Sequence, residues 1–174
     1  MRLSHRGILW LAEGFGSGRL RPGPGTWGSL VGCALSYPLL SLPLGTAVIV
    51  TLAAILLAVP VCSRAEVLLG KTDPGSVVLD EIVAIPLTLL PLHAGVLLGA
   101  IHPPRVLTSL PTHGLWWLAA FALFRVLDIG KPGPIGALQH LPRGWGIVMD
   151  DVAAGLITGL ILLGAGWMAP TLMR

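Results

Sequence analysis

The chain has 174 residues, a length that suits a single domain over residues 1–174. It is 54% hydrophobic and only 11% charged, with a mean hydropathy of +0.84, whereas a soluble domain typically carries about 25% charged residues. This composition excludes an ordinary soluble protein and indicates an integral membrane protein. The net charge is +3, and we expect no nucleic-acid partner; the oligomeric state stays open.

The N-terminal stretch precedes the first expected span. Residues 5–13 are predicted to form a short interfacial helix, with its apolar residues toward lipid. Residues 14–29 are so rich in Gly and Pro that we predict a loop without regular structure. At the end of this loop, Thr26 and Ser29 are candidate caps for the helix that follows.

Five apolar stretches are predicted to be transmembrane helices: residues 29–44, 46–62, 77–101, 114–128 and 147–168. The first and fourth are short for the about 20 residues that a bilayer needs. Prolines interrupt the first and third, and the third is either one kinked helix or two half-helices broken near Pro91. The expected fold is therefore an all-α bundle of about five transmembrane helices, joined by polar segments at 63–76, 102–113 and 129–146.

The basic residues fall mainly on one side of such a bundle. With five spans, one side holds nine of them and the other holds Arg105 and Arg174. Because cytoplasmic segments carry an excess of Lys and Arg, the first side is predicted to face the cytoplasm. The nine are Arg2, Arg6, Arg19, Arg21, Arg64, Lys71, Arg125, Lys131 and Arg143.

Five of the eight acidic residues lie at span ends on that same predicted face. A carboxylate at the bilayer centre costs about 3 kcal/mol on insertion scales, so acids in spans are rare and usually functional. Carboxylates gathered near one plane repel each other unless a cation neutralises them, and Mg²⁺ prefers such oxygen ligands together with a substrate phosphate. The sequence thus predicts a cytoplasmic-face active site with a hard cation. The five are Asp80, Glu81, Asp128, Asp150 and Asp151.

Two cations stand beside these acids. Arg125 and Asp128 are three residues apart and share a helix face, and Lys131 precedes Pro132, so extended backbone is expected at Lys131. Arg125 and Lys131 are expected to contact a phosphate beside the metal, with the hydroxyl of Thr26 and backbone N–H groups from the 14–29 loop. A site of this kind suits a phosphorylated lipid headgroup.

Five motifs together resemble the bacterial phosphatidylglycerophosphatase A family, from about residue 12 to residue 160. The resemblance implies an integral, multi-pass protein of the bacterial cytoplasmic (inner) membrane. It also implies a Mg²⁺-dependent phosphatase that converts phosphatidylglycerophosphate in the membrane to phosphatidylglycerol, the last step of phosphatidylglycerol synthesis. In chain order the motifs are Gly14-Phe15-Gly16-Ser17-Gly18, Pro24-Gly25-Thr26-Trp27-Gly28-Ser29, Asp73-Pro74-Gly75-Ser76-Val77-Val78-Leu79-Asp80-Glu81, Phe124-Arg125-Val126-Leu127-Asp128-Ile129-Gly130-Lys131-Pro132-Gly133-Pro134-Ile135 and Gly144-Trp145-Gly146-Ile147-Val148-Met149-Asp150-Asp151-Val152-Ala153-Ala154-Gly155.

The resemblance also assigns roles. It implies that the five carboxylates are the catalytic residues, and we expect four of them to hold the metal: Asp80, Glu81, Asp150 and Asp151. Substrate binding is expected from Thr26, Arg125 and Lys131. The chain departs from the family at Arg143, where the family often has glycine, and in a shortened apolar stretch at 136–143, which concerns substrate contacts rather than chemistry.

Three other interpretations stay open at this point. The first is that four acids form ion pairs with Arg125 and Lys131 that only hold the bundle together: Asp80, Glu81, Asp150 and Asp151. A cation transporter also uses intramembrane acids, but it would place them at several depths, and here nearly all lie at one face. The third alternative is a structural subunit of a membrane complex.

Overall fold

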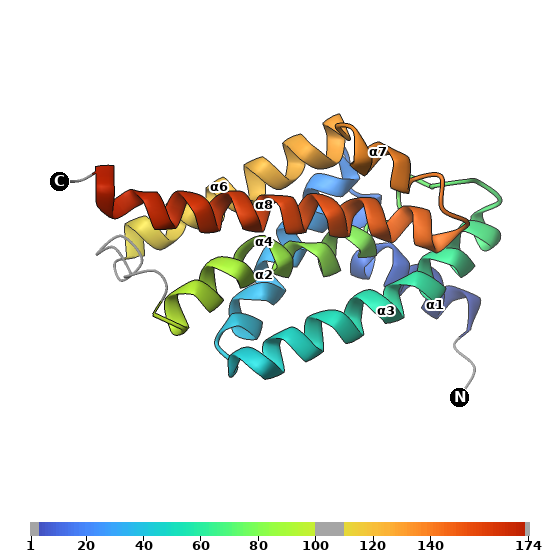
Figure 1. Cartoon of the computed structure of the whole chain (residues 1–174). Coiled ribbons are helices and arrows are strands. Elements are labelled where there is room, and N and C mark those ends of the chain that lie inside the picture. Colours follow the sequence, from blue (N-terminus) through green and yellow to red (C-terminus); the bar gives the residue numbers. More distant parts are fainter. Residues whose placement is uncertain (1–3, 100–109, 173–174) are drawn as a thin grey trace.

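A computed structural model describes residues 4–99 and 110–172, and the regular elements within these residues are all helical (Figure 1). The predicted all-α class is therefore confirmed for the described residues. Most of the predicted connection at 102–113, including Arg105, lies outside them. The elements are α1 (His5–Ala12), the 3₁₀ helix η1 (Gly14–Arg19), α2 (Pro24–Leu40), α3 (Leu44–Leu69), α4 (Leu79–Leu97), α6 (Leu110–Gly130), α7 (Pro134–Leu138) and α8 (Gly144–Leu172).

Within the described residues, three helices are long and apolar enough to cross a membrane: α3, α4 and the part of α8 over Gly144–Met168. They correspond to the second, third and fifth predicted spans, and they agree with a membrane protein. The first and fourth predicted spans fall in α2, which has 17 residues, and in α6; neither is among the three helices identified in the described part of the chain. The count of five spans accordingly stays a prediction.

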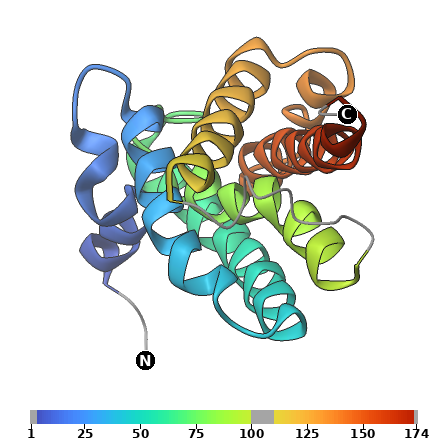
Figure 2. The same ribbon diagram turned by 90° about the vertical axis from the view of Figure 1, so that its left-hand side faces the viewer.

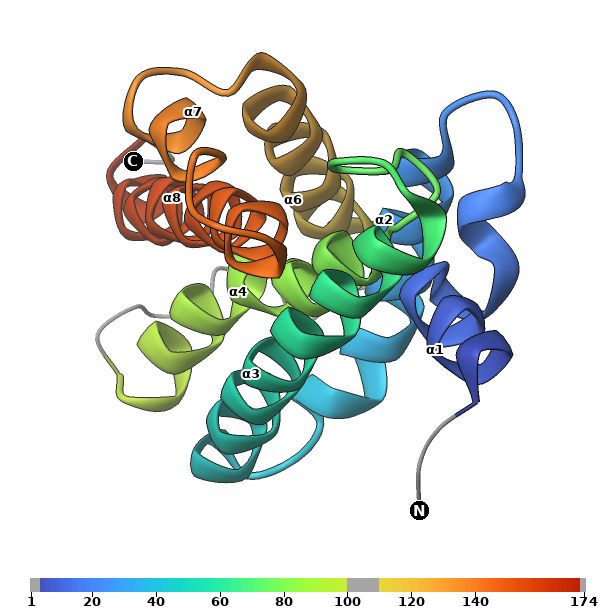
Figure 3. The same cartoon turned by 90° about the vertical axis from the view of Figure 1, so that its right-hand side faces the viewer.

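Helix α4 is the centre of the bundle and packs against α2, α3, α6 and α8. In its apolar window 78% of the residues are buried, against 28% in α3. Figures 2 and 3, which view the molecule from its two sides, show the other long helices around α4. An apolar helix that is buried on all faces can carry charged groups only where its neighbours supply partners, so α4 is where the position of polar residues is most informative.

The five long helices alternate in direction (Figure 1). The first residues of α2, α4 and α8 therefore lie toward the same end of the bundle as the last residues of α3 and α6. The short helices α1 and α7 are also at this end. Every motif that the sequence analysis singled out is consequently brought to one end of the molecule.

Several predicted boundaries were wrong. The loop at 14–29 contains η1, and α2 already begins at Pro24, because proline fits the first turn of a helix. Neither Thr26 nor Ser29 caps α2, whose N-cap is Gly23 without a side-chain hydrogen bond. Helix α3 continues through the first half of the polar segment at 63–76 and ends at Leu69.

Of the two alternatives for the third span, the structure shows one helix, which contains both Pro86 and Pro91. Pro91 cannot donate to the carbonyl of Leu87, four residues earlier. Gly159 of α8 packs directly against that carbonyl, and a Cβ atom at this position would collide with it. The absence of a side chain therefore lets α8 lie close to the irregular backbone of α4. Tight packing against α8 allows the helix to continue through the proline.

Candidate active site

Asp80 and Glu81 occupy the first turn of α4, where the positive end of the helix dipole favours acidic side chains. The chain enters this turn through Val78, whose backbone N–H donates to the carbonyl of Ala12 at the end of α1. Both acidic side chains are buried. The start of α4 thus places two carboxylates inside the bundle rather than in solvent.

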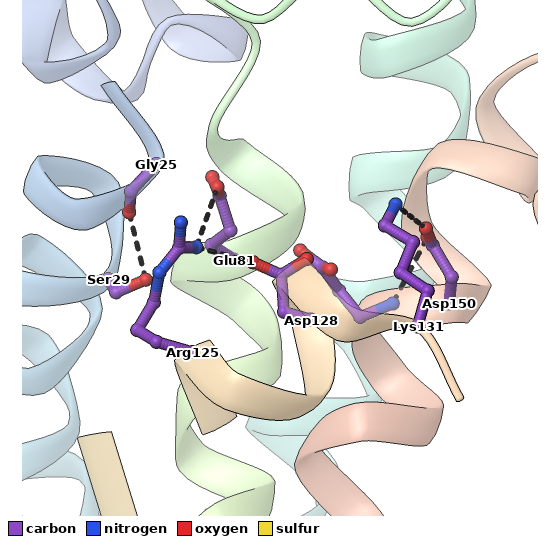
Figure 4. A network of polar contacts seen from close by, with 8 residues as sticks. Gly25, Ser29, Glu81, Arg125, Asp128, Lys131 and Asp150 are labelled. Atoms are coloured by element: carbon purple, nitrogen blue, oxygen red, sulfur yellow. Dashed lines mark hydrogen bonds and ion pairs between the residues drawn. The ribbon is translucent and has the colours of Figure 1, made fainter. Parts of the chain in front are cut away.

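Arg125 joins the α4 acids to α6 (Figure 4). Its Nη1 lies 3.3 Å from Glu81 Oε1 and 2.5 Å from Asp128 Oδ2. Arg125 and Asp128 share a helix face, as predicted, and their spacing of three residues allows this pair. Arg125 Nε is buried and has no partner among the described residues, so the guanidinium keeps a donor free.

Lys131 joins the end of α6 to α8. Its Nζ lies 2.5 Å from Oδ2 of Asp150, which is almost fully buried (Figure 4). The predicted extended backbone at Lys131 was wrong: its φ is 41°, and its N–H donates to the carbonyl of Leu127, as in a left-handed helix cap. Burial lowers the pKa of Lys131, but the hydrogen bond and charge of Asp150 outweigh burial, and the pKa is raised above 10.5. The ammonium is therefore charged at neutral pH.

Three carboxylates form a group beside these ion pairs, and one of them, Glu81, is also the partner of Arg125. Asp80, Glu81 and Asp151 each offer an oxygen, and these oxygens lie within 4.8 Å of one another. Three oxygens are buried and lack a hydrogen-bond partner in the described part of the chain: Asp80 Oδ1, Glu81 Oε2 and Asp151 Oδ2. Buried carboxylates without partners are costly, so this donor set is chemically suited to a hard divalent cation.

The expected metal set is brought together only in part. Three of its four members converge, whereas Asp150 directs Oδ2 to Lys131 and accepts the backbone N–H of Asp151 with Oδ1. The sequence placed Asp150 and Asp151 in one motif but could not show that neighbouring residues on a helix point in different directions.

Helix α2 closes the site on the side of Glu81 and Arg125. A Cβ atom built on Gly25 would collide with Glu81 and lie 3.0 Å from Nη1 and Nη2 of Arg125, and one on Gly28 would lie 3.1 Å from Glu81 Oε2. Ser29 donates to the carbonyl of Gly25 within the same helix (Figure 4). The glycines let the backbone of α2 approach the ion pair between Glu81 and Arg125. The prediction of a loop in this segment did not include this role. The three- and four-residue spacing of Gly25, Gly28 and Gly32 was the available signal.

Thr26 is the sequence-predicted site residue for which no hydrogen bond to the cluster is found within the described residues. It is exposed in the first turn of α2. The other seven predicted site residues all lie in the cluster at one end of the bundle: Asp80, Glu81, Arg125, Asp128, Lys131, Asp150 and Asp151.

The structure defines the class of this protein. It is a helical membrane protein with buried acids, an arginine and a lysine at one end of its bundle. A family model described as phosphatidylglycerophosphatase A matches residues 10–166. The chain belongs to the phosphatidylglycerophosphatase A family and is a phosphatase.

Curated relatives agree with this family. A phosphatidylglycerophosphatase A of Haemophilus influenzae is 40% identical over 159 residues, which cover 89% of this chain and 86% of the relative. The protein of the same name in Escherichia coli is 35% identical over 161 residues, with coverages of 90% and 83%. A Bacteroides thetaiotaomicron protein, provisionally named a phosphatidylinositol-3-phosphatase, is 31% identical over 166 residues, with coverages of 91% and 92%. No solved structure matches the chain significantly.

Proposed function

We propose that this protein is a Mg²⁺-dependent phosphatase that hydrolyses phosphatidylglycerophosphate to phosphatidylglycerol and phosphate, the final step of phosphatidylglycerol synthesis. The names of the Haemophilus influenzae and Escherichia coli relatives support this substrate. The metal requirement is supported by the carboxylate group at the start of α4 and α8. The family membership favours this function over the cation transporter and the structural subunit.

One observation carries the proposal: Asp80 and Asp151 are buried and have no cation beside them in the described residues. Ion pairing within the bundle explains Glu81 and Asp128, which contact Arg125, and Asp150, which contacts Lys131. It leaves Asp80 and Asp151 unexplained. A bound Mg²⁺ held by Asp80, Glu81 and Asp151 would neutralise them, polarise the phosphate ester and lower the pKa of a bound water.

The protein's own groups then have separate tasks. Arg125 would donate to a phosphate oxygen through its free Nε–H while Asp128 holds the guanidinium in place. Lys131 would place a second positive charge at the opposite flank, oriented by Asp150. A carboxylate of the cluster that is not occupied with the metal would accept a proton as general base. Burial by α2, α4 and α8 would restrict access of bulk water to these groups.

The proposed setting is the bacterial cytoplasmic membrane, crossed by about five helices, with the site facing the cytoplasm. The distribution of basic residues supports this orientation. The gathering of the candidate residues at one end of the bundle supports a substrate whose phosphate lies at headgroup level and whose acyl chains stay in the bilayer.

Phosphate release by purified protein in detergent–lipid micelles tests this function. Phosphatidylglycerophosphate should be hydrolysed with Mg²⁺ present and not in excess EDTA, and Asp151→Asn should lower turnover by orders of magnitude. Asp73→Asn, which alters an exposed acid near the start of α4, is the matched control and should keep turnover. Preference for phosphatidylinositol 3-phosphate, as the name of the Bacteroides relative suggests for that protein, would contradict the proposed substrate.

A further inference from the structure

One cleft in the described part of the chain lies apart from the carboxylate cluster. It has a volume of about 600 Å³ and lies between the C-terminal part of α3 and the segment that leads into α8. Its lining includes Arg64, Arg143, Trp145, Val59 and Val67 and shares no residue with the candidate active site. The catalytic proposal therefore leaves this cleft without a role.

The two arginines of the cleft carry charges that nothing in the described structure neutralises. The two cations of the candidate active site are engaged instead: Arg125 with Glu81 and Asp128, and Lys131 with Asp150. Neither Arg64 nor Arg143 has a carboxylate within ion-pair distance among the described residues, and those that line the cleft include no acid. Two unpaired guanidinium groups on opposite walls of one cleft attract a single anion, and planar guanidinium groups suit phosphate oxygens.

The two walls of the cleft contact each other at Gly144. The N–H of Gly144 donates to Ser63 Oγ at 3.0 Å, and a Cβ atom at Gly144 would collide with the backbone of α3. Arg143 has a φ of 55°, in the left-handed region where arginine is strained and glycine is not. The chain thus places a large cation at the rim where glycine would fit with less strain.

The remaining lining matches a lipid better than a soluble anion. Both valines of the lining belong to α3, a helix of membrane-spanning length: Val59 is buried, and Val67 is 59% exposed. Trp145 is 45% exposed at the rim, and tryptophan is typical of the level between headgroups and acyl chains. A ligand with a phosphate between the arginines and acyl chains along α3 would satisfy both parts of this surface.

We infer that this cleft binds the phosphate headgroup of an anionic phospholipid as a second lipid site, separate from catalysis. Basic pockets beside transmembrane helices bind such headgroups through their arginines. The inference stands whether or not the carboxylate cluster hydrolyses phosphatidylglycerophosphate, because it concerns binding by a different set of residues.

Native mass spectrometry of purified protein titrated with phosphatidylglycerol in detergent tests the inference. The double variant Arg64→Gln/Arg143→Gln should bind the first phosphatidylglycerol about thirtyfold more weakly, which corresponds to about 1 kcal/mol for each basic residue near a lipid surface. Arg6→Gln, which removes an exposed arginine of α1, is the matched control and should bind as the wild type does. Phosphatidylcholine should show no dependence on the two arginines.

Three results would overturn the inference. Equal phosphatidylglycerol binding by the double variant and the control would remove the cleft as a site. Loss of tight binding in Arg125→Gln instead would place the lipid at the carboxylate cluster. Competition by inorganic phosphate at equal concentration would identify the ligand as free phosphate.

Two further measurements test the inference even when the double variant does not fold. Arg143→Gly suits the backbone at φ 55° and should weaken lipid binding while the protein stays folded. In the unaltered protein, a photoactivatable phosphatidylglycerol should crosslink to peptides that contain residues 59–67 and 142–145. Crosslinks elsewhere, with none in these peptides, would contradict the site.

Discussion

Asp80 on α4 and Asp151 on α8 approach each other with carboxylate oxygens within 4.8 Å, and each has a buried oxygen without a hydrogen-bond partner in the described structure. Two adjacent carboxylates in a buried site repel each other unless a cation or a proton lies between them. This relationship, rather than the ion pairs beside it, distinguishes a binding site from a structural network.

Asp151→Asn should raise the thermal unfolding midpoint of the purified protein in EDTA. The substitution removes one of the mutually repelling charges and leaves no cation without its partner, because Asp151 has none in the described residues. Differential scanning fluorimetry in detergent measures the effect, with Asp73→Asn as the control. A large loss of stability in Asp151→Asn would show that this carboxylate serves a structural pair instead.

Lys131→Met should destabilise the protein, in contrast to Asp151→Asn. It leaves the Asp150 carboxylate, whose side chain is only 4% exposed, without its cation, at a cost of about 1–3 kcal/mol. The double variant Lys131→Met/Asp150→Asn should recover most of the loss, because both members of the pair are then neutral. Unfolding midpoints of the two single variants and the double variant provide the test, and simple addition of the single effects would refute the coupling.

Gly25→Val should lower turnover by about a hundredfold by displacing the pair formed by Glu81 and Arg125, since small errors in the position of catalytic groups have effects of this size. Gly164→Ala is the matched control, because a Cβ atom at Gly164 meets nothing within 4 Å. Phosphate release at saturating substrate, normalised to folded protein, measures the effect. Unchanged turnover in Gly25→Val would mean that the approach of α2 to the pair is irrelevant to catalysis.

Arg125→Lys should lower turnover about a hundredfold or more although it keeps the charge, as the loss of one placed donor does in other enzymes. A lysine has a single nitrogen, which could replace Nη1 beside Glu81 and Asp128 but could not also place a donor at the position of Arg125 Nε. The exposed substitution Arg6→Lys should have no effect. If Arg125→Lys retains wild-type turnover, only the charge of the guanidinium matters, and the proposed contact through Nε fails.

The class of fold and most of the site were predictable from the sequence, because both depend on local patterns. Apolar stretches of helical length indicated the bundle, and alternation of their direction brought Asp80, Asp128 and Asp151 to one end. The Arg125–Asp128 pair was predictable from its three-residue spacing.

What the sequence could not supply depends on contacts between helices. The contact between Lys131 and Asp150 requires the position of α6 relative to α8, which no local pattern contains. Glycine and proline in 14–29 favoured a loop, yet Gly25 and Gly28 lie in a helix because close packing on α4 stabilises it. In this second case tertiary packing outweighed local preference.

The most direct test of the central claim is isothermal titration calorimetry of Mg²⁺ into metal-free protein without substrate. We expect saturable binding by the wild type and by Asp73→Asn, with binding abolished or greatly weakened in Asp80→Asn and Asp151→Asn. At 100 times its dissociation constant, Mg²⁺ should then stabilise the wild type by about 2.7 kcal/mol through linkage, and the two variants far less. Identical Mg²⁺ binding by wild type, Asp80→Asn and Asp151→Asn would contradict the claim that these carboxylates hold the metal.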